Sequence, residues 1–461
     1  MIMRPLSALL LPLSLAACAL TPPPAPPSID MPAAWSAPTP AGAPVADPWP
    51  AFGSPHLAQL IDEALAASPD VGIGAARVRQ AEAALRSAGA SRYPTVDLDA
   101  GTDARRSDGV ERRSTRASLG MGVELDLWGR IAAGVSGAEA GLAASRHDLV
   151  ALRLSLAAGV AGSYVDALAL RARLAIARDN LAIAERLLAI VEARYRNGAA
   201  SALDLARQRA TVLARRAAIL PLEEQLVQTR SALALLLGRP PQGFALGDEA
   251  LDTLTVPEVA PGLPAELLLR RPDLAAAEAR LAAASADVTA ARAALLPALR
   301  LTAAGGLASE ALLAFTNPSR SASLGAALAQ RLFDGGARAA AIDSAEARRE
   351  EQIARYRQTV LAALKEVEDA LGNVALGARQ QTAAQAIVAE SRRALALAEL
   401  RYREGADPLS EVLDAQRTLF DAKDQLAGFR RDRLTAAIAL SLALGGGWQS
   451  PTDPIAHEPA R

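Results

Sequence analysis

The chain has 461 residues, of which 51% are hydrophobic but only 3% aromatic, and its formal net charge is −1 at pH 7. This aliphatic composition, dominated by alanine and leucine, favours helix and suffices for a large core, and the charge balance does not indicate nucleic acid as a partner. Three scattered histidines (His56, His147, His457) and one cysteine offer little for a metal site or a thiol catalyst, so we expect neither metal nor cofactor.

The N-terminus has the pattern of a bacterial lipoprotein signal. Arg4 precedes an apolar run that ends in the lipobox Leu15-Ala16-Ala17-Cys18. We predict a signal peptide at 1–17, lipidation of Cys18, and an extended proline-rich tether over 18–56. Ala19 is not the aspartate that retains lipoproteins in the inner membrane, so we expect a protein anchored in the outer membrane. The alternative is an ordinary cleaved signal with an incidental cysteine.

The chain contains an internal duplication. RYRNG begins at residue 194 and RYREG at 401, which is 401 − 194 = 207 residues later, while Pro69 and Pro272 lie 203 residues apart in similar contexts. We therefore predict two structural repeats, 57–250 and 251–448, followed by a C-terminal tail at 449–461. Each repeat should contain a helix, two strands, a very long helix and a second long helix.

Four segments alternate apolar and polar residues in the manner of membrane barrel strands, and a soluble hairpin packed on one face is the alternative. Their predicted ranges are about 94–106, 115–128, 297–307 and 321–333. Beyond the signal, no uninterrupted apolar stretch reaches the roughly 18 residues that a membrane helix needs. An open four-stranded sheet would leave unpaired backbone groups in lipid, so two or three chains would have to close it.

The long helices are predicted at about 131–196, 201–238, 338–403 and 408–444. The first and third of these lack proline, and about 66 helical residues would extend roughly 100 Å, which suits a helical tube. The alternative is a stack of shorter helices broken at Gly159–Gly162 or Gly372–Gly377.

The repeated turns carry ordinary helix-ending signals. Arg194-Tyr195 and Arg401-Tyr402 place cations at helix C-termini, and Gly198 and Gly405 suit the left-handed residue that ends a helix. Ser201 with Asp204, and Asp407 with Pro408, would begin the following helices. This capping account requires no function.

Several motifs together resemble the TolC-like outer-membrane efflux protein family, in particular its lipoprotein branch that works with resistance-nodulation-division pumps. They occur in family order: the lipobox, ELDLWGR at 124, ALLLGRPP at 234, ELLLRRPDLAAAEARLAAA at 266, PALRLT at 297, the two RY-x-x-G turns, VLDAQRTL at 412 and LALGGGW at 442. The resemblance implies a mainly α protein with a membrane β-barrel. It also implies a homotrimer whose twelve-stranded barrel continues into a periplasmic helical tunnel, with a membrane-fusion adaptor, an inner-membrane transporter and outer-membrane lipid as partners.

The resemblance also assigns a periplasmic entrance. Glu411 and Asp414 are three residues apart, hence on one helix face, and match the family's carboxylate rings. Two solvated acids near a helix N-terminus are the alternative. Asp204 and Tyr402 match partners that hold the entrance shut, whereas Asp407 replaces the family's basic residue and departs from the pattern.

The turns themselves are expected to meet the adaptor. Their residues are Arg194, Tyr195, Gly198, Arg401 and Gly405.

No enzyme motif of the G-x-x-x-x-G-K-[ST], H-E-x-x-H or G-x-S-x-G kind occurs, so we expect a passive channel and not an enzyme. Two alternatives remain open. One is an exit duct for an ABC-type secretion or metal-efflux system, although only 4 methionines make a thioether metal path unpromising. The other is a periplasmic scaffold lipoprotein without a channel.

Overall fold

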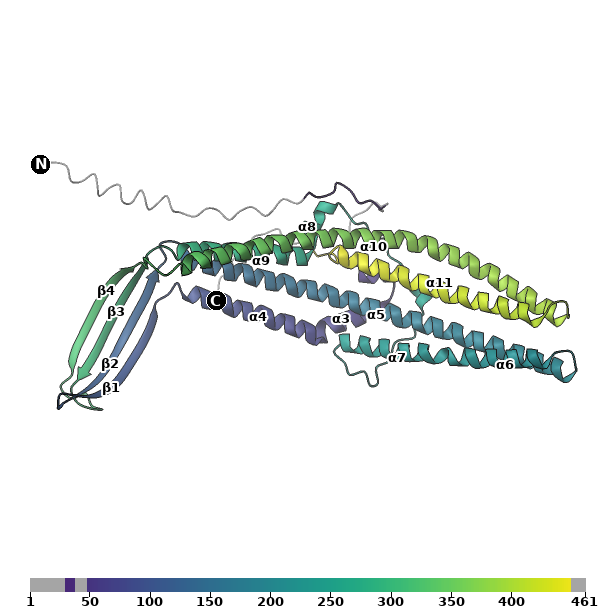
Figure 1. Cartoon of the computed structure of the whole chain (residues 1–461), viewed down its shortest axis with the longest axis horizontal. Helices are drawn as coiled ribbons and strands as arrows, with labels where there is room; N and C mark the ends of the chain where they lie inside the picture. The colour runs from purple at the N-terminus through teal and green to yellow at the C-terminus, as the bar shows by residue number, and fades with distance from the viewer. Residues whose placement is uncertain (1–29, 38–47, 449–461) are drawn as a thin grey trace. The chain divides into compact units, whose positions relative to one another are not determined.

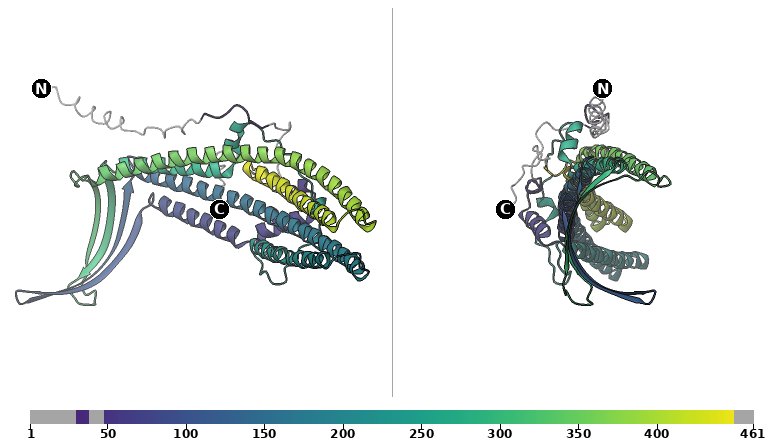
Figure 2. Two further views of the ribbon diagram at one scale, coloured as in Figure 1. Left: turned by 45° about the vertical axis from the view of Figure 1, so that its right-hand side comes forward. Right: turned by 90° about the vertical axis from the view of Figure 1, so that its left-hand side faces the viewer.

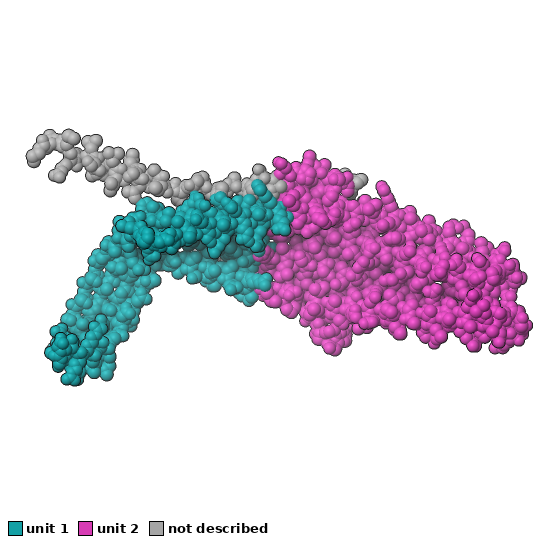
Figure 3. All heavy atoms as spheres, viewed as in Figure 1, with its two compact units in different colours: residues 1–29, 76–147, 274–359 teal, residues 30–75, 148–273, 360–461 magenta. Residues whose placement is uncertain are grey.

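The computed structural model describes residues 30–37 and 48–448, which form two compact units (Figure 3). The strand unit comprises residues 76–147 and 274–359, and the helix unit comprises the remaining described residues. The predicted signal peptide, Cys18 and the tail at 449–461 lie outside the described residues.

The order of elements repeats (Figure 1). The first copy is α4 (Pro69–Ala90), β1 (Thr95–Ser107), β2 (Val110–Leu125) and α5 (Arg130–Arg196), and the second is α9 (Pro272–Ala293), β3 (Ala298–Ser309), β4 (Ser319–Ala329) and α10 (Ala337–Arg403). Corresponding helices have equal lengths, 22 residues for α4 and α9 and 67 for α5 and α10. The predicted fold of two repeated halves is confirmed.

Shorter elements and the returning helices complete the helix unit. They are η1 (Trp49–Phe52), α3 (Pro55–Ala67), α6 (Ala202–Ala217), α7 (Ile219–Leu236), η2 (Leu251–Thr253), η3 (Pro264–Glu266), α8 (Leu267–Arg270) and α11 (Leu409–Ala443).

Helices α5 and α10 have no break at their glycines, so the alternative of stacked shorter helices is wrong. The glycines instead permit close packing. A methyl group at Gly159 would lie 3.8 Å from Leu236, and one at Gly377 would lie 3.5 Å from Arg433. Because glycine has no side chain, a neighbouring helix can pack closely at these two positions.

The helix predicted over 201–238 is two helices, because α6 ends at Ala217 and α7 begins at Ile219. Pro221 explains the break, since its ring lacks an N–H and conflicts with the carbonyl four residues earlier, that of Ala217. Ala218 keeps helical angles, with φ −67° and ψ −15°, so the chain direction is largely preserved.

The four strands form one antiparallel sheet in the order β1-β2-β3-β4, which Figure 2 shows as a single curved layer. Strand β2 begins five residues earlier than the predicted 115, at Val110, directly opposite Ser107. The cause is a two-residue turn at Asp108 and Gly109, whose φ angles are 52° and 82°. Asp-Gly favours this kind of hairpin turn, so the signal was present in the sequence.

Two strands end earlier than predicted because acidic side chains start the next helix. Strand β2 ends at Leu125 instead of about 128, and the Asp126 carboxylate accepts hydrogen bonds from the backbone of Ile131 at 3.0 Å and Ala132 at 2.7 Å. Strand β4 ends at Ala329 instead of about 333, and Asp334 accepts from Gly336 N at 3.1 Å. Both carboxylates satisfy amides that a helix start leaves unpaired.

The core of the helix unit is centred on α5, where Val160, Tyr164 and Leu168 are at most 1% exposed. Among the described helices, α5 alone contains an 18-residue window apolar enough by length and composition to cross a membrane, with mean hydropathy 1.3 and 39% of the window buried. Such a window can contain up to two charged residues, so it differs from the uninterrupted apolar run that the sequence lacks. The partial burial of the α5 window fits a helix that packs in the core of this unit.

The last helix of each repeat is followed by a glycine that lies against the start of the same repeat. Gly238 has φ +70°, and a Cβ there would lie 2.7 Å from the Ala67 carbonyl oxygen. Gly445 has φ +87°, and its Cβ would lie 1.8 Å from the Arg270 carbonyl oxygen. Neither position can hold a side chain without movement of the backbone.

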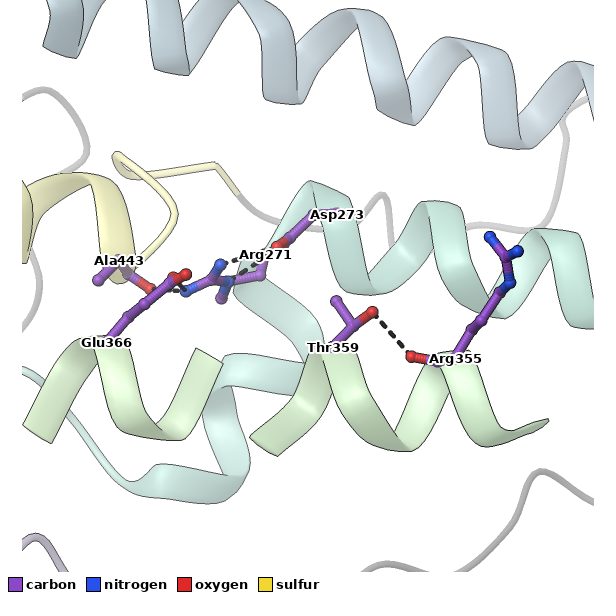
Figure 4. Close-up of polar contacts among 6 residues, drawn as sticks. All are labelled: Arg271, Asp273, Arg355, Thr359, Glu366 and Ala443. Atoms are coloured by element: carbon purple, nitrogen blue, oxygen red, sulfur yellow. Dashed lines mark hydrogen bonds and ion pairs between the residues drawn. The ribbon is translucent and has the colours of Figure 1, made fainter. Parts of the chain in front are cut away.

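Next to Gly445, the buried Arg271 side chain fixes the same junction (Figure 4). Its guanidinium forms ion pairs with Asp273 at 2.7 Å and Glu366 at 2.8 Å, and donates to the Ala443 carbonyl at 3.0 Å. Arg271 is only 8% exposed, so these partners compensate a charge that would otherwise be costly to bury.

Candidate functional site

The two repeated turns have the same backbone. In the first, Ala199 N donates to Arg194 O at 2.8 Å and Gly198 N to Tyr195 O at 3.0 Å. In the second, the equivalent bonds from Ala406 and Gly405 are 2.9 Å and 3.1 Å. Both are Schellman motifs with a left-handed glycine, at φ 72° for Gly198 and 78° for Gly405. Helices α5 and α10 therefore end directly before these turns, at Arg196 and Arg403.

Asp204 belongs to the start of α6. Ser201 and Asp204 form a capping box, in which the Ser201 hydroxyl accepts from Asp204 N at 3.1 Å and the carboxylate accepts from Ser201 N at 3.1 Å. The hydrogen bonds from the Ser201 side chain and backbone hold the pKa of the Asp204 carboxyl below its usual value.

Tyr402 lies against Arg194 of the other repeat. The Arg194 guanidinium donates to the Tyr402 carbonyl at 2.7 Å, and its central carbon lies 4.6 Å from the centre of the Tyr402 ring. Burial raises the pKa of the Tyr402 hydroxyl, which Arg194 partly opposes and Asp204 reinforces. Tyr402 and Asp204 thus lie near each other, but no hydrogen bond joins them within the described part of this chain.

Asp407 forms a contact that the sequence did not indicate. Its carboxylate takes two hydrogen bonds from the Arg401 guanidinium, at 2.6 Å and 2.9 Å, across the second turn. These bonds hold the pKa of Asp407 below its usual value. Helix α11 starts after Pro408 without a side-chain cap. Asp407 therefore stabilises the turn through Arg401 and does not cap the helix.

Glu411 and Asp414 occupy the first turns of α11, and both are exposed. Asp414 forms an ion pair of 2.6 Å with Arg417, whereas Glu411 has no ion-pair partner among the described residues. Asp414 also lines a groove between α6 and α11 together with Asp204 and Arg207. The structure therefore brings two of the predicted entrance acids, Asp204 and Asp414, to one surface.

No group of three or more His, Cys, Asp or Glu side chains that could hold a metal ion occurs within residues 30–37 and 48–448.

The sheet has one apolar face, which the pairing register aligns across all four strands. Val96 pairs with Met121, Met121 with Ala303, and Ala303 with Leu324. The apolar face comprises Val96, Leu98, Ala100, Ala117, Leu119, Met121, Val123, Leu125, Leu299, Leu301, Ala303, Leu307, Ala322, Leu324, Ala326 and Leu328.

No other part of the described chain covers this face. Leu98 is 75% exposed, Leu324 is 89% and Leu328 is 67%. The opposite, polar face carries Asp97, Asp99, Asp103, Ser114, Ser118, Glu124, Arg300, Thr302, Ser321 and Ser323. Soluble monomeric proteins rarely expose an apolar surface of this extent, so the exposure favours lipid-facing strands over the soluble hairpin.

An exposed apolar sheet face combined with two very long helices and paired helical turns defines the class of an outer-membrane channel protein. The family described as "Outer membrane efflux protein" matches residues 60–239 and 263–446, one segment in each repeat. The chain therefore belongs to the outer membrane efflux protein family.

Relatives cover nearly the whole chain. The "Pyoverdine export outer membrane protein OpmQ" of Pseudomonas putida is 43% identical over 468 residues, covering 97% of this chain and 99% of that protein. The "Cation efflux system protein CusC" of Escherichia coli is 31% identical over 405 residues, covering 86% and 87%.

Solved channels have the same fold. The outer-membrane channel OprN matches with a TM-score of 0.84 at 30% identity, covering 92% of this chain and 99% of that one. The open state of the Neisseria gonorrhoeae MtrE channel matches with a TM-score of 0.85 at 27% identity, covering 95% and 100%. The chain is thus the outer-membrane channel of an efflux pump system, and it is not an enzyme.

Proposed function

We propose that three copies of the chain close a twelve-stranded barrel that is continuous with a periplasmic helical tunnel. The exposed apolar face of the sheet is the observation that carries this proposal. Strands β1 and β4 each have one edge that no described strand pairs. Unpaired edges in lipid cost several kcal/mol per backbone group, so β1 of one copy would pair with β4 of the next. The homotrimer follows the number implied by the family.

Two exposed helix surfaces support assembly of like chains. Along α6 and α7, exposed residues recur at alternating spacings of three and four, as in a coiled-coil seam. They are Leu203, Ala206, Ala210, Leu213, Ala217, Leu220, Glu224 and Val227, of which Leu213 and Leu220 are each 64% exposed. A second such seam runs along α10 through Leu376, Gln380, Ala383, Ile387, Glu390, Ala394, Leu397 and Arg401. Pairing of the two seams between neighbouring copies would extend the ring of helices below the barrel.

The tips of the helices would form the periplasmic entrance. Around a three-fold axis, Glu411 and Asp414 become two stacked acidic rings, which favour cations in a narrow pore. Tyr402 and Asp204 would hold neighbouring hairpins together in the closed state. Their proximity within one chain supports this role, because a small shift between hairpins could bring the hydroxyl of one to the carboxylate of the other.

The exposed turns would contact a periplasmic membrane-fusion adaptor, which links the channel to an inner-membrane resistance-nodulation-division transporter. Tyr195 is 44% exposed and Gly198 has open space around it, so the first turn is free to pack against a partner. Arg194 and Arg401 instead hold the turns in shape through their contacts within the chain. Gly405, like Gly198, has open space around it and completes the adaptor-facing set.

A lipid at Cys18 would anchor the N-terminus to the outer membrane. The described segment 30–37 fits a tether that follows the helix unit, since Trp35 Nε1 donates to the Gly262 carbonyl at 2.9 Å. Ser36 N also donates to the Glu368 carboxylate at 3.0 Å.

The exported molecules would be small solutes supplied by the transporter. The relative with 43% identity is named for pyoverdine export, so pyoverdine is the first exported molecule to test. The CusC relative supports metal efflux as a second candidate, because its name assigns cations. Export by strains that lack the chain, complemented with its gene, would separate the two classes.

The first experiment is conductance of the purified chain in planar bilayers, comparing the native protein with Glu411→Ala plus Asp414→Ala. A small, cation-selective conductance that loses selectivity in the double variant is expected. Asp62→Ala plus Asp70→Ala removes the same charge from α3 and α4 and should leave selectivity unchanged. Selectivity retained in the entrance variant would remove these acids from the pore, and absence of conductance from folded protein would favour a scaffold.

A further inference from the structure

The outer hairpin between β1 and β2 is rich in arginine, and the strand register sorts these side chains onto the two faces of the sheet. Ala104 pairs with Arg113 and Arg106 with Glu111, in the same alternation as Ala100 with Ala117. Arg106, Glu111 and Arg113 therefore share the apolar face.

The same register places a third arginine on the apolar face and others on the polar face. Arg320 of β4 pairs with Leu307, which in turn pairs with Ala117. The polar face receives Arg105, Arg112 and Arg116. Toward the hairpin end each face thus carries three arginines, since the fourth polar-face arginine, Arg300, pairs with Glu124 near the helices, and this provides a matched comparison.

The length of the apolar band shows how far Arg106, Arg113 and Arg320 lie from the hydrocarbon region of the membrane. On β2 it runs from Ala117 to Leu125, or 125 − 117 = 8 steps. At about 3.4 Å per step and a tilt of about 40°, this spans roughly 21 Å, close to the typical hydrocarbon band of about 25 Å. Arg320 lies level with the last apolar row, and Arg113 lies four residues beyond it, toward the hairpin.

The two ends of this band differ chemically. At the end joined to the helices, Tyr93 is 72% exposed and Phe333 is 88% exposed, as expected of aromatic residues at a membrane interface. The hairpin end carries the arginines in addition to one exposed aromatic residue, Phe315, which is 47% exposed in the connection between β3 and β4. Arg106 and Arg320 have no ion-pair partner among the residues that the structure describes, and Arg113 is paired with Glu111 at 2.9 Å.

We infer that Arg106, Arg113 and Arg320 bind the phosphate groups of the glycolipid in the outer leaflet of the outer membrane. This inference rests on the proposed barrel, which turns the apolar face toward lipid and the hairpin end outward. Three arginines and one glutamate leave a net charge of +2 per chain on this rim. The guanidinium fork matches phosphate with two parallel hydrogen bonds, and a rim continuous with the hydrocarbon band meets headgroups instead of free solutes.

The test uses the full-length, lipidated protein in detergent with bisphosphorylated lipid A as the probe. Arg106→Gln/Arg113→Gln/Arg320→Gln should weaken binding by at least about tenfold, equivalent to about 1.4 kcal/mol. Arg105→Gln/Arg112→Gln/Arg116→Gln removes equal charge from the polar face and should change binding less than about twofold. A third variant, with lysine at the three rim positions, keeps the charge and should lie between them.

Several outcomes would overturn the inference. Equal losses in the two glutamine variants would mean that bulk charge, and not the lipid-facing rim, binds the probe. Equal binding of phosphate-free lipid A would assign recognition to the acyl chains, and equal binding of phosphatidylglycerol would assign it to ordinary phospholipid headgroups. Conductance distinguishes failure of the lipid A site from failure of the proposed channel. If the oligomers conduct ions but the rim variant leaves lipid A binding unchanged, only this inference is rejected. If the native protein forms neither oligomers nor a conducting channel, the proposed channel is rejected as well.

Discussion

The first and second turns share a backbone but differ in what their side chains do. Tyr195 and Tyr402 occupy equivalent positions, yet Tyr195 is 44% exposed and Tyr402 only 5%. The first turn is followed by a capping box at Ser201, and the second is closed by the ion pair of Arg401 with Asp407. Duplication thus preserved the backbone hydrogen bonds, while the side chains of the two copies became specialised for different surroundings.

The largest expected difference is between the two tyrosines. Tyr402→Ala removes a buried ring that packs with Leu409 and Val412, and should lower the local free energy of unfolding by about 3 to 5 kcal/mol. Tyr195→Ala should change it by less than about 0.5 kcal/mol, as at other surface positions. Hydrogen exchange of the turn amides measures both. Equal effects would show that assembly buries Tyr195 as deeply as Tyr402.

The two glycines should instead behave alike. A Cβ at Gly198 or Gly405 meets no atom within 4 Å, so only the left-handed backbone opposes substitution. Alanine at either position should cost about 1 to 2 kcal/mol, again measured by local hydrogen exchange. Gly428→Ala, within α11 and equally open, is the control and should stabilise by about 1 kcal/mol. A clearly larger cost at one turn would reveal a partner packed against it.

The two arginines should differ more modestly. Arg194→Ala loses the 2.7 Å bond to the Tyr402 carbonyl and the stacking on its ring, and should cost about 1 to 2 kcal/mol. Arg401→Ala loses an exposed ion pair and should have little effect on stability. Thermal unfolding of the native protein and of both variants at low and high salt distinguishes them, since only the stability loss caused by Arg401→Ala should shrink as salt screens the exposed pair. A stability loss in Arg194→Ala that disappears at high salt would contradict this assignment.

The smallest expected effect is the loss of stability of the two turns at acid pH. Asp204 and Asp407 have pKa values held below the ordinary value of about 3.9, so their contribution is fully present above about pH 4 and is lost as pH falls through the folded-state values. Pepsin cleavage at the turns should therefore increase below about pH 4. Ser201→Ala combined with Asp407→Asn should flatten this dependence, and an unchanged profile would mean that other groups control it.

Much of the fold could be predicted because its signals are local. Proline-free, alanine-rich stretches predicted the long helices, glycine after RY-x-x predicted their ends, and two-residue alternation predicted the strands. The break before Pro221 and the turn at Asp108-Gly109 also have local signals, because proline and Asp-Gly each favour one backbone geometry.

The candidate site was harder because its contacts are not local. Arg194 meets Tyr402 across 208 residues, and no periodicity within either turn distinguishes the buried tyrosine from the exposed one. The pair of Arg401 with Asp407 spans a turn in which the chain reverses, so neither helical nor strand spacing indicates it.

The glycine contacts that close each repeat bear on how the chain arose. Because Gly238 rests on Ala67 and Gly445 on Arg270, each copy finishes beside its own beginning. A tandem gene duplication joins the end of one copy to the start of the next, so a unit with adjacent ends can be copied without a long new connection. Glycine at these two positions therefore keeps the two ends of each repeat adjacent, which is the arrangement that a tandem duplication connects with the least new chain.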